Sequence, residues 1–225
     1  MKHLLIFDAY GTLFSTGTGS IDAVKKILGL QDKAISPRDF YADWKRYHRM
    51  HMDECNAGVF LTERNIFAMD LKMLYEQYGI NRRYEQDVEI MLGSLLGRQL
   101  FAEVSGTIVE LRKRYRVVIG STTDTAPLLI NMQENHFAVD EVYTSEQIGK
   151  YKPAKEFYEY ILQREGCRAE EAVFIGDSLV DDILGPSKAG LTTVLVDRKK
   201  QYKQGDSVKP DCIVADLSGM MALNL

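Results

Sequence analysis

The chain has 225 residues, a length that suits one domain or one domain carrying a smaller insert. Hydrophobic residues make up 45% of it and charged residues 27%, which excludes a disordered tail and a fibrous repeat. Lys and Arg number 28 against 32 Asp and Glu, and the net charge of −4 argues against a nucleic-acid binder held by a broad cationic face.

The cysteines and the N-terminal sequence indicate a compartment. Cys55, Cys167 and Cys212 are far apart and show no C-x-x-C spacing, which is typical of a reducing environment. The first apolar run, residues 4–7, ends at Asp8 and is too short for a signal peptide or a membrane span. We therefore expect a cytoplasmic protein that does not enter a membrane.

Amphipathic helical segments without β-branched runs follow the first apolar run. Ser36, before Pro37, is a candidate helix N-cap, and a further helix is expected between Thr62 and Gly79. These patterns predict an all-helical second domain, a cap, inserted into the chain just after the first strand. Its expected range is 15–97, and the α/β core is expected to comprise 1–14 and 98–225.

Short apolar runs that end at small or polar residues recur in the rest of the chain. With the first run, they are residues 4–7, 117–119, 172–175 and 193–196. Helical patterns lie near 103–115, 125–136, 154–165 and 181–189. The alternation of strands and helices predicts a doubly wound, Rossmann-like α/β fold with a parallel sheet covered on both faces. The basic tract 198–200 is expected to be a solvated loop edge.

Polar residues follow the predicted strands where such sheets bind ligands. Asp8, Ser121 and Asp177 each stand at or just beyond a strand's carboxyl end, and Asp182 lies close to Asp177 in sequence. A carboxylate there can act as a nucleophile or as a ligand of Mg²⁺. Carboxylates from two strands would repel one another without a cation between them, so the pattern predicts a metal.

Four motifs in order resemble those of the haloacid dehalogenase-like (HAD) hydrolase superfamily. They are the run Asp8-Ala9-Tyr10-Gly11-Thr12, Ser121 after an apolar strand, Lys152-Pro153, and Gly176-Asp177-Ser178 with Asp182. The helical insert after the first motif is similar in position to the small cap of many members. The resemblance covers essentially the whole chain and implies a hydrolase.

The resemblance implies a role for each matching residue. Asp8 would attack the substrate and form a covalent aspartyl intermediate that water hydrolyses. Ser121, with the neighbouring Thr122, would hydrogen-bond the transferring group. Lys152 would neutralise charge on the nucleophile and in the transition state. A shift of the loop register would put Lys150 or Lys155 in its place.

The resemblance also implies a metal site. Asp8, Asp177 and the backbone carbonyl of Tyr10 would bind Mg²⁺, and Asp182 would be a further ligand or would hold the metal's waters or Lys152. Asp181 is expected to complement the dipole of the following helix.

Tyr10 departs from the pattern of the phosphatases in this superfamily, which usually carry a second Asp two residues after the nucleophile. That acid protonates the leaving alkoxide. A phenol, with a reference pKa near ~10, can donate a proton but is a poor general base. In this motif the chain is similar to the dehalogenating members, which act on 2-halo acids and whose halide leaves without a proton.

The acidic motif at the other end of the site favours phosphoryl chemistry. The dehalogenating members have small neutral residues where this chain keeps Asp177, and Trp44 is followed by Lys45 rather than the expected Arg. A phosphoryl group needs a metal, whereas unshielded carboxylates would repel a halo acid. We therefore expect a Mg²⁺-dependent phosphatase acting on a small phosphorylated metabolite. The alternatives are a 2-haloacid dehalogenase and a catalytically weak relative that binds phosphorylated ligands.

Overall fold

A computed structural model describes residues 3–31, 33–203 and 205–223 of the chain. The chain forms two compact units, one made of Met1–Ser15 with Gln99–Leu225 and the other of Thr16–Arg98. Each is described separately below. Over the described ranges, no helix is both long enough and apolar enough to cross a membrane.

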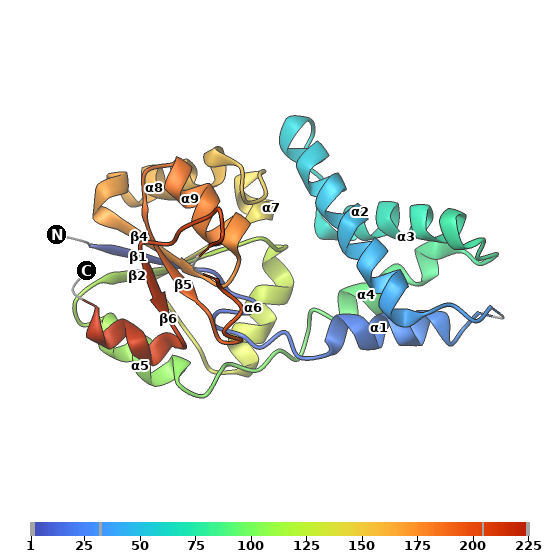
Figure 1. The fold of residues 1–225 in the computed structure, drawn as a ribbon, viewed down its shortest axis with the longest axis horizontal. Coiled ribbons are helices and arrows are strands. Elements are labelled where there is room, and N and C mark those ends of the chain that lie inside the picture. The colour runs from blue at the N-terminus through green and yellow to red at the C-terminus, as the bar shows by residue number, and fades with distance from the viewer. Residues whose placement is uncertain (1–2, 32, 204, 224–225) are drawn as a thin grey trace. The chain divides into compact units, whose positions relative to one another are not determined.

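The first unit is built around a six-stranded parallel sheet (Figure 1). The strands are β1 (Leu4–Phe7), β2 (Arg116–Ser121), β3 (Glu141–Thr144), β4 (Ala172–Gly176), β5 (Thr192–Val196) and β6 (Cys212–Val214). Their order is β3-β2-β1-β4-β5-β6, so the winding reverses direction at β1, which pairs with β2 on one side and β4 on the other. Such a reversal opens a crevice at the carboxyl ends of the strands.

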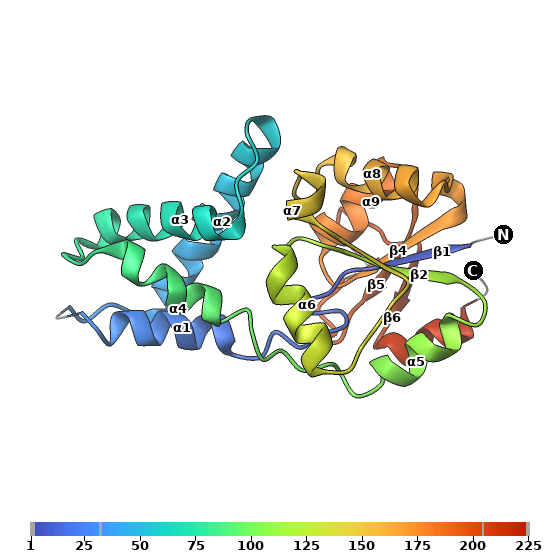
Figure 2. The same ribbon diagram turned by 180° about the vertical axis from the view of Figure 1, so that it is seen from behind.

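Helices cover both faces of this sheet, as predicted (Figure 2). They are α5 (Val104–Leu111), α6 (Thr125–Glu134), α7 (Ser145–Ile148), α8 (Lys155–Glu165) and α9 (Gly185–Lys188). Alternate residues of β1 face opposite sides: Leu5 and Phe7 pack with α5 and α6, whereas Leu4 and Ile6 pack with α8. Because both faces are buried, the central strands are apolar throughout.

The structure adds elements that were not predicted and divides one that was. The edge strands β3 and β6 were not predicted, because β3 begins with the exposed Glu141 and β6 has only three residues, of which Ile213 is exposed. The helix expected over 181–189 divides into a π-helical segment, Leu179–Leu184, followed by the short α9. Pro186, which cannot donate a backbone hydrogen bond, lies at the start of α9.

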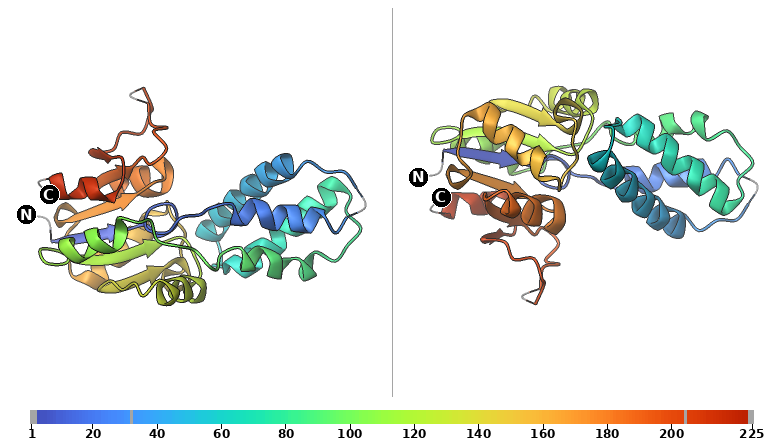
Figure 3. Two further views of the ribbon diagram at one scale, coloured as in Figure 1. Left: turned by 90° about the horizontal axis from the view of Figure 1, so that it is seen from below. Right: turned by 90° about the horizontal axis from the view of Figure 1, so that it is seen from above.

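The second unit packs helices around its own apolar core (Figure 3). They are α1 (Gly19–Leu28), α2 (Pro37–Ala57), α3 (Glu63–Tyr78) and α4 (Val88–Gly93). Ser36 caps α2 by accepting a hydrogen bond from the Asp39 N–H, and Gly79 ends α3 in the left-handed conformation, as predicted. The fully buried Asp70 carboxylate accepts a hydrogen bond from the Trp44 indole at 3.0 Å and lies 2.6 Å from the His51 ring.

Candidate active site

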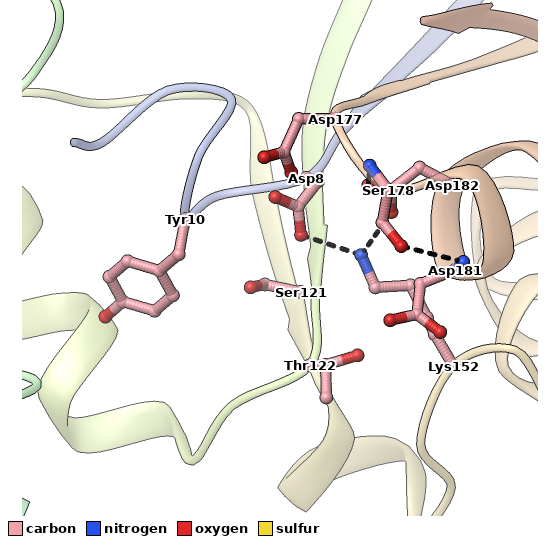
Figure 4. A pocket seen from close by; sticks show the side chains of 9 residues that line it. All are labelled: Asp8, Tyr10, Ser121, Thr122, Lys152, Asp177, Ser178, Asp181 and Asp182. Carbon is pink, nitrogen blue, oxygen red and sulfur yellow. Dashed lines mark hydrogen bonds and ion pairs between the residues drawn. The ribbon is translucent and has the colours of Figure 1, made fainter. Parts of the chain in front are cut away.

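Asp8 lies at the carboxyl end of β1, in the crevice where the winding reverses (Figure 4). Its N–H donates to the Ile175 carbonyl of β4 at 2.8 Å, which fixes the backbone at this point. The Asp8 side chain is 10% exposed. One carboxylate oxygen, Oδ1, accepts a hydrogen bond from Lys152, and the other, Oδ2, is buried without a hydrogen-bond partner among the described residues.

Lys152 joins the carboxylate of Asp8, after β1, to that of Asp182, in the π-helical segment that follows β4. Its Nζ is 2.7 Å from Asp8 Oδ1 and 2.7 Å from Asp182 Oδ1, and its side chain is 2% exposed. Burial alone would lower the pKa of this ammonium, but the charges of Asp182 and Asp8 outweigh it and raise the pKa above the usual range. Lys152, rather than Lys150 or Lys155, lines the pocket, and Lys155 pairs with Glu159 on an exposed helix face.

Carboxylate oxygens of Asp8, Asp177 and Asp182 all lie within 4.8 Å of one another. Asp182 is buried and accepts a hydrogen bond from the Ser178 N–H at 2.9 Å, whereas Asp177 is exposed to solvent at the edge of the cluster. Burial raises the pKa of Asp182 to about 7, although Lys152 opposes the rise. Partial desolvation and repulsion from Asp182 raise the pKa of Asp177 to about 6.

Two glycines, which lack side chains, leave room for the carboxylates of this cluster. A methyl group at Gly11 would overlap the Asp177 carboxylate, and one at Gly176 would overlap Asp182. The backbone therefore lies directly against two of the three acids.

The donor set fits a small hard cation. Three carboxylates converge, and one of their oxygens, Asp8 Oδ2, is buried without a hydrogen-bond partner in the described part of the chain. A buried carboxylate oxygen without a partner is costly, and a bound cation would satisfy it while relieving the repulsion between the acids. Carboxylate oxygens are the ligands that Mg²⁺ prefers in proteins.

Ser121 and Thr122, at and after the end of β2, line the same pocket, whose cavity volume is about 150 Å³ (Figure 4). Ser121 is 1% exposed. The Thr122 Oγ1 is buried and has no hydrogen-bond partner among the residues described. Ser121 and Thr122 therefore bring hydroxyl groups to the pocket that Asp8 and Lys152 line.

Tyr10 lines the pocket with its ring turned away from the acids (Figure 4). Its hydroxyl accepts a hydrogen bond at 2.9 Å from the Nδ2 of Asn131 on α6, and its ring packs 6.1 Å from that of Phe14. Asn131 is fully buried. Sequence reasoning missed this partner, because it lies 121 residues from Tyr10 in a helix whose pattern indicated only packing.

Arg198 is not the solvated loop residue that the sequence predicted. Its side chain is 16% exposed and forms an ion pair with Glu103. The two charges pair across the fold, because the loop after β5 lies beside the start of α5. A run of basic residues carries no signal for such a contact.

The six-stranded parallel sheet, with its acidic cluster beyond β1 and β4, defines a Rossmann-like α/β protein whose crevice carries a lysine-paired aspartate. A family model described as haloacid dehalogenase-like hydrolase matches residues 2–190. The chain therefore belongs to the haloacid dehalogenase-like hydrolases, as its motifs predicted, and it is a hydrolase.

Similar proteins include two glyceraldehyde 3-phosphate phosphatases. The protein from Methanothermobacter thermautotrophicus is 34% identical over 68% of this chain and 77% of its own. The protein from Methanopyrus kandleri is 36% identical over 79% of this chain and 85% of its own. Among solved structures, the L-2-haloacid dehalogenase from Xanthobacter autotrophicus superposes with a TM-score of 0.81 at 16% identity, covering 99% of this chain and 98% of that one. At that identity the likeness shows the fold alone.

Proposed function

We propose that this protein is a Mg²⁺-dependent phosphatase that acts on a small phosphorylated metabolite through a covalent aspartyl intermediate at Asp8. The observation that carries the proposal is the convergence of Asp8, Asp177 and Asp182 within 4.8 Å beside a buried lysine. A neutral residue at position 177 would not repel the carboxylate of a halo acid. The three carboxylates can instead bind a cation, which would neutralise a phosphoryl group. The phosphatase names of the two relatives support the same chemistry.

In the first step an Asp8 carboxylate oxygen attacks phosphorus, and the bond from phosphorus to the leaving oxygen breaks with its electron pair going to that oxygen. An aspartyl phosphate results. Lys152, held protonated by Asp8 and Asp182, offsets the repulsion between the carboxylate and the phosphoryl group. The hydrogen bond from Lys152 to Oδ1 also fixes the plane of the Asp8 carboxylate.

In the second step water attacks the aspartyl phosphate, and inorganic phosphate leaves as the Asp8 carboxylate is restored. The Ser121 and Thr122 hydroxyls lie in the pocket as hydrogen-bond donors to the phosphoryl oxygens in both steps. Asp8, Asp177, Asp182 and the Tyr10 carbonyl oxygen would hold Mg²⁺, which would supply positive charge to neutralise the transferring group. The helical unit is the cap of this enzyme.

Tyr10 is the feature that favours the second candidate, a 2-haloacid dehalogenase. No carboxyl group stands at this position, and a halide leaves without a proton. The same acidic cluster that suits Mg²⁺ would repel the carboxylate of a halo acid. We therefore place the dehalogenase second.

Phosphate release tests the proposal. The substrates are p-nitrophenyl phosphate and glyceraldehyde 3-phosphate, the compound named for the two relatives. We expect release that requires Mg²⁺, stops with EDTA and is lost in Asp8→Asn. Asp206→Asn, on a loop outside the pocket, is the matched control and should keep full activity. Metal-independent halide release from 2-chloropropionate, without phosphate release, would overturn the proposal in favour of the dehalogenase.

A further inference from the structure

The loop that carries Asp8 continues directly into one of the two segments that connect the core unit to the helical unit. The core unit ends at Ser15 and resumes at Gln99. The Ser15 N–H donates to the Gln99 carbonyl at 2.8 Å, and the Phe101 N–H donates to the Leu13 carbonyl at 3.0 Å. Residues 13–15 and 99–101 therefore form a short antiparallel pair, which we call the connecting ribbon.

Hydrogen bonds tie the connecting ribbon to the nucleophile loop. The Leu13 and Phe14 N–H groups both donate to the Ala9 carbonyl, at 2.9 and 2.8 Å. The Gly11 N–H donates back to the Phe14 carbonyl at 2.7 Å. Because Ala9 follows Asp8 directly, a displacement of the ribbon moves the backbone that positions the nucleophile.

Arg198, in the loop after β5, contacts both sides of this assembly. One guanidinium nitrogen donates to the Thr12 carbonyl at 2.8 Å and lies 2.6 Å from the Glu103 carboxylate. The guanidinium Cζ lies over the ring of Phe101, 3.7 Å from its centroid. One side chain thus joins the nucleophile loop, the connecting ribbon and the segment that leads into α5.

The chemistry of these contacts is specific to arginine. A planar guanidinium can stack on an aromatic ring while its N–H groups donate hydrogen bonds sideways. The compact ammonium of lysine cannot make both contacts in this way. The side chains of Arg198 and Glu103 are only 16% and 23% exposed, so water screens their attraction less than that of a surface pair.

We propose that Arg198 is a positioning residue, which holds the nucleophile loop and the connecting ribbon in the geometry that the Asp8 reaction needs. It acts through Thr12 and Phe101 and touches no reacting atom. This inference rests on the proposed phosphatase activity for its kinetic consequence. Its structural consequence, the anchoring of the ribbon, stands independently of the reaction.

Arg198→Met tests the anchor, because methionine keeps much of the apolar stem and removes the donors and the charge. We expect kcat for p-nitrophenyl phosphate to fall about tenfold or more with KM nearly unchanged, since misplacing reacting groups by ~1 Å costs up to about 100-fold. Hydrogen exchange at the Ser15 and Phe101 amides should accelerate on the order of tenfold, and exchange in β4 should stay unchanged. Arg198→Lys should show a smaller change in the same direction.

Arg168→Met is the matched control, because Arg168 is an exposed arginine of the core unit that pairs with Glu171 before β4. It should leave kcat and both amide exchange rates at their wild-type values. Should Arg198→Met prove poorly folded, Arg198→Lys takes its place with the same measurements. The inference is overturned if the folded Arg198 variants match Arg168→Met in kcat and in exchange. If the wild-type protein releases no phosphate, the proposed function fails, and the exchange rates alone decide whether Arg198 anchors the ribbon.

Discussion

Gly11 lies against the carboxylate of Asp177 so closely that no side chain fits between them. Its φ of +99° is one that residues with a side chain rarely adopt. The turn after Asp8 therefore depends on this glycine twice, for its backbone conformation and for the space that the Asp177 carboxylate occupies.

Gly11→Ala should consequently weaken metal binding as well as activity. The added methyl group would displace Asp177, and we expect the Mg²⁺ concentration for half-maximal activity to rise about tenfold or more, a loss in the range found when the supporting contacts of a metal ligand are removed. Activity titrated with Mg²⁺ measures it. Gly149→Ala is the control for backbone strain. Gly149 also has a positive φ, +74°, but no atom lies within 4 Å of the carbon that the substitution would add. Equal Mg²⁺ requirements in the two variants would contradict the overlap with Asp177.

The acidic cluster should make the effect of Mg²⁺ on stability depend on pH. Without metal, the pKa of Asp177 is raised to about 6 and that of Asp182 to about 7, from 3.8. A carboxyl with a raised pKa contributes stability that is present below pH ~4 and is lost as pH rises through its folded-state pKa. The metal-free protein should therefore lose stability between about pH 4 and 7.

Mg²⁺ should restore that stability, because it competes with protons for the same oxygens. We expect the rise in Tm on adding Mg²⁺ to be larger at pH 8 than at pH 5, measured by thermal unfolding. In Asp177→Asn most of this difference should disappear. A Tm increase of the same size at both pH values would show that these carboxylates do not bind the ion.

Lys152→Met should destabilise the fold as well as abolish activity. The substitution leaves Asp8 and Asp182 buried without their shared cation, and breaking a buried pair in this way costs about 3–5 kcal/mol of the free energy of unfolding. Adding Asp182→Asn removes one of the two buried carboxylates left without a cation. The double variant should therefore be more stable than Lys152→Met but equally inactive. Urea unfolding at pH 8 without Mg²⁺ measures the free energy of unfolding of the single and the double variant. A double variant no more stable than Lys152→Met would contradict the coupling of Lys152 to Asp182.

The sequence predicted the central strands and the residues that meet at their ends for one physical reason. Strands buried on both faces are apolar throughout, so β1, β2, β4 and β5 were visible as runs, and the carboxyl ends of parallel strands share one edge. The edge strands β3 and β6 lack that pattern because each includes an exposed residue, Glu141 in β3 and Ile213 in the three-residue β6.

Contacts between distant residues outside the four motifs were beyond prediction from one sequence. Arg198 donates to the Thr12 carbonyl 186 residues away, and a backbone carbonyl has no identity that a sequence pattern can reveal. Asn131, the partner of Tyr10, lies on a helix placed only by the fold of the sheet. The Rossmann-like α/β fold class was therefore predicted, whereas the contacts of Arg198 with Thr12 and of Asn131 with Tyr10 were found only in the structure.

The orientation of Tyr10 leads to a last prediction, about the leaving group. Its hydroxyl accepts from Asn131 on α6, and its ring points away from the acids, so this phenol is poorly placed to protonate a leaving oxygen at Asp8 (Figure 4). Tyr10→Phe should lower kcat less than about threefold, because proton donation by a well-placed acid is worth about 100-fold or more. Tyr143→Phe, which removes a hydroxyl bound to Glu165 outside the pocket, is the control.

An enzyme without a well-placed acid should depend steeply on how readily its leaving group departs. We expect wild-type kcat/KM for p-nitrophenyl phosphate to exceed that for an alkyl phosphate by about 100-fold or more, the size of the missing acid contribution. Tyr10→Asp supplies a carboxyl group on a shorter side chain and should reduce that ratio by accelerating the alkyl ester. A ratio near one in the wild type, together with a loss of about 100-fold in Tyr10→Phe, would show instead that the phenol swings from Asn131 to the substrate and is the acid of this enzyme.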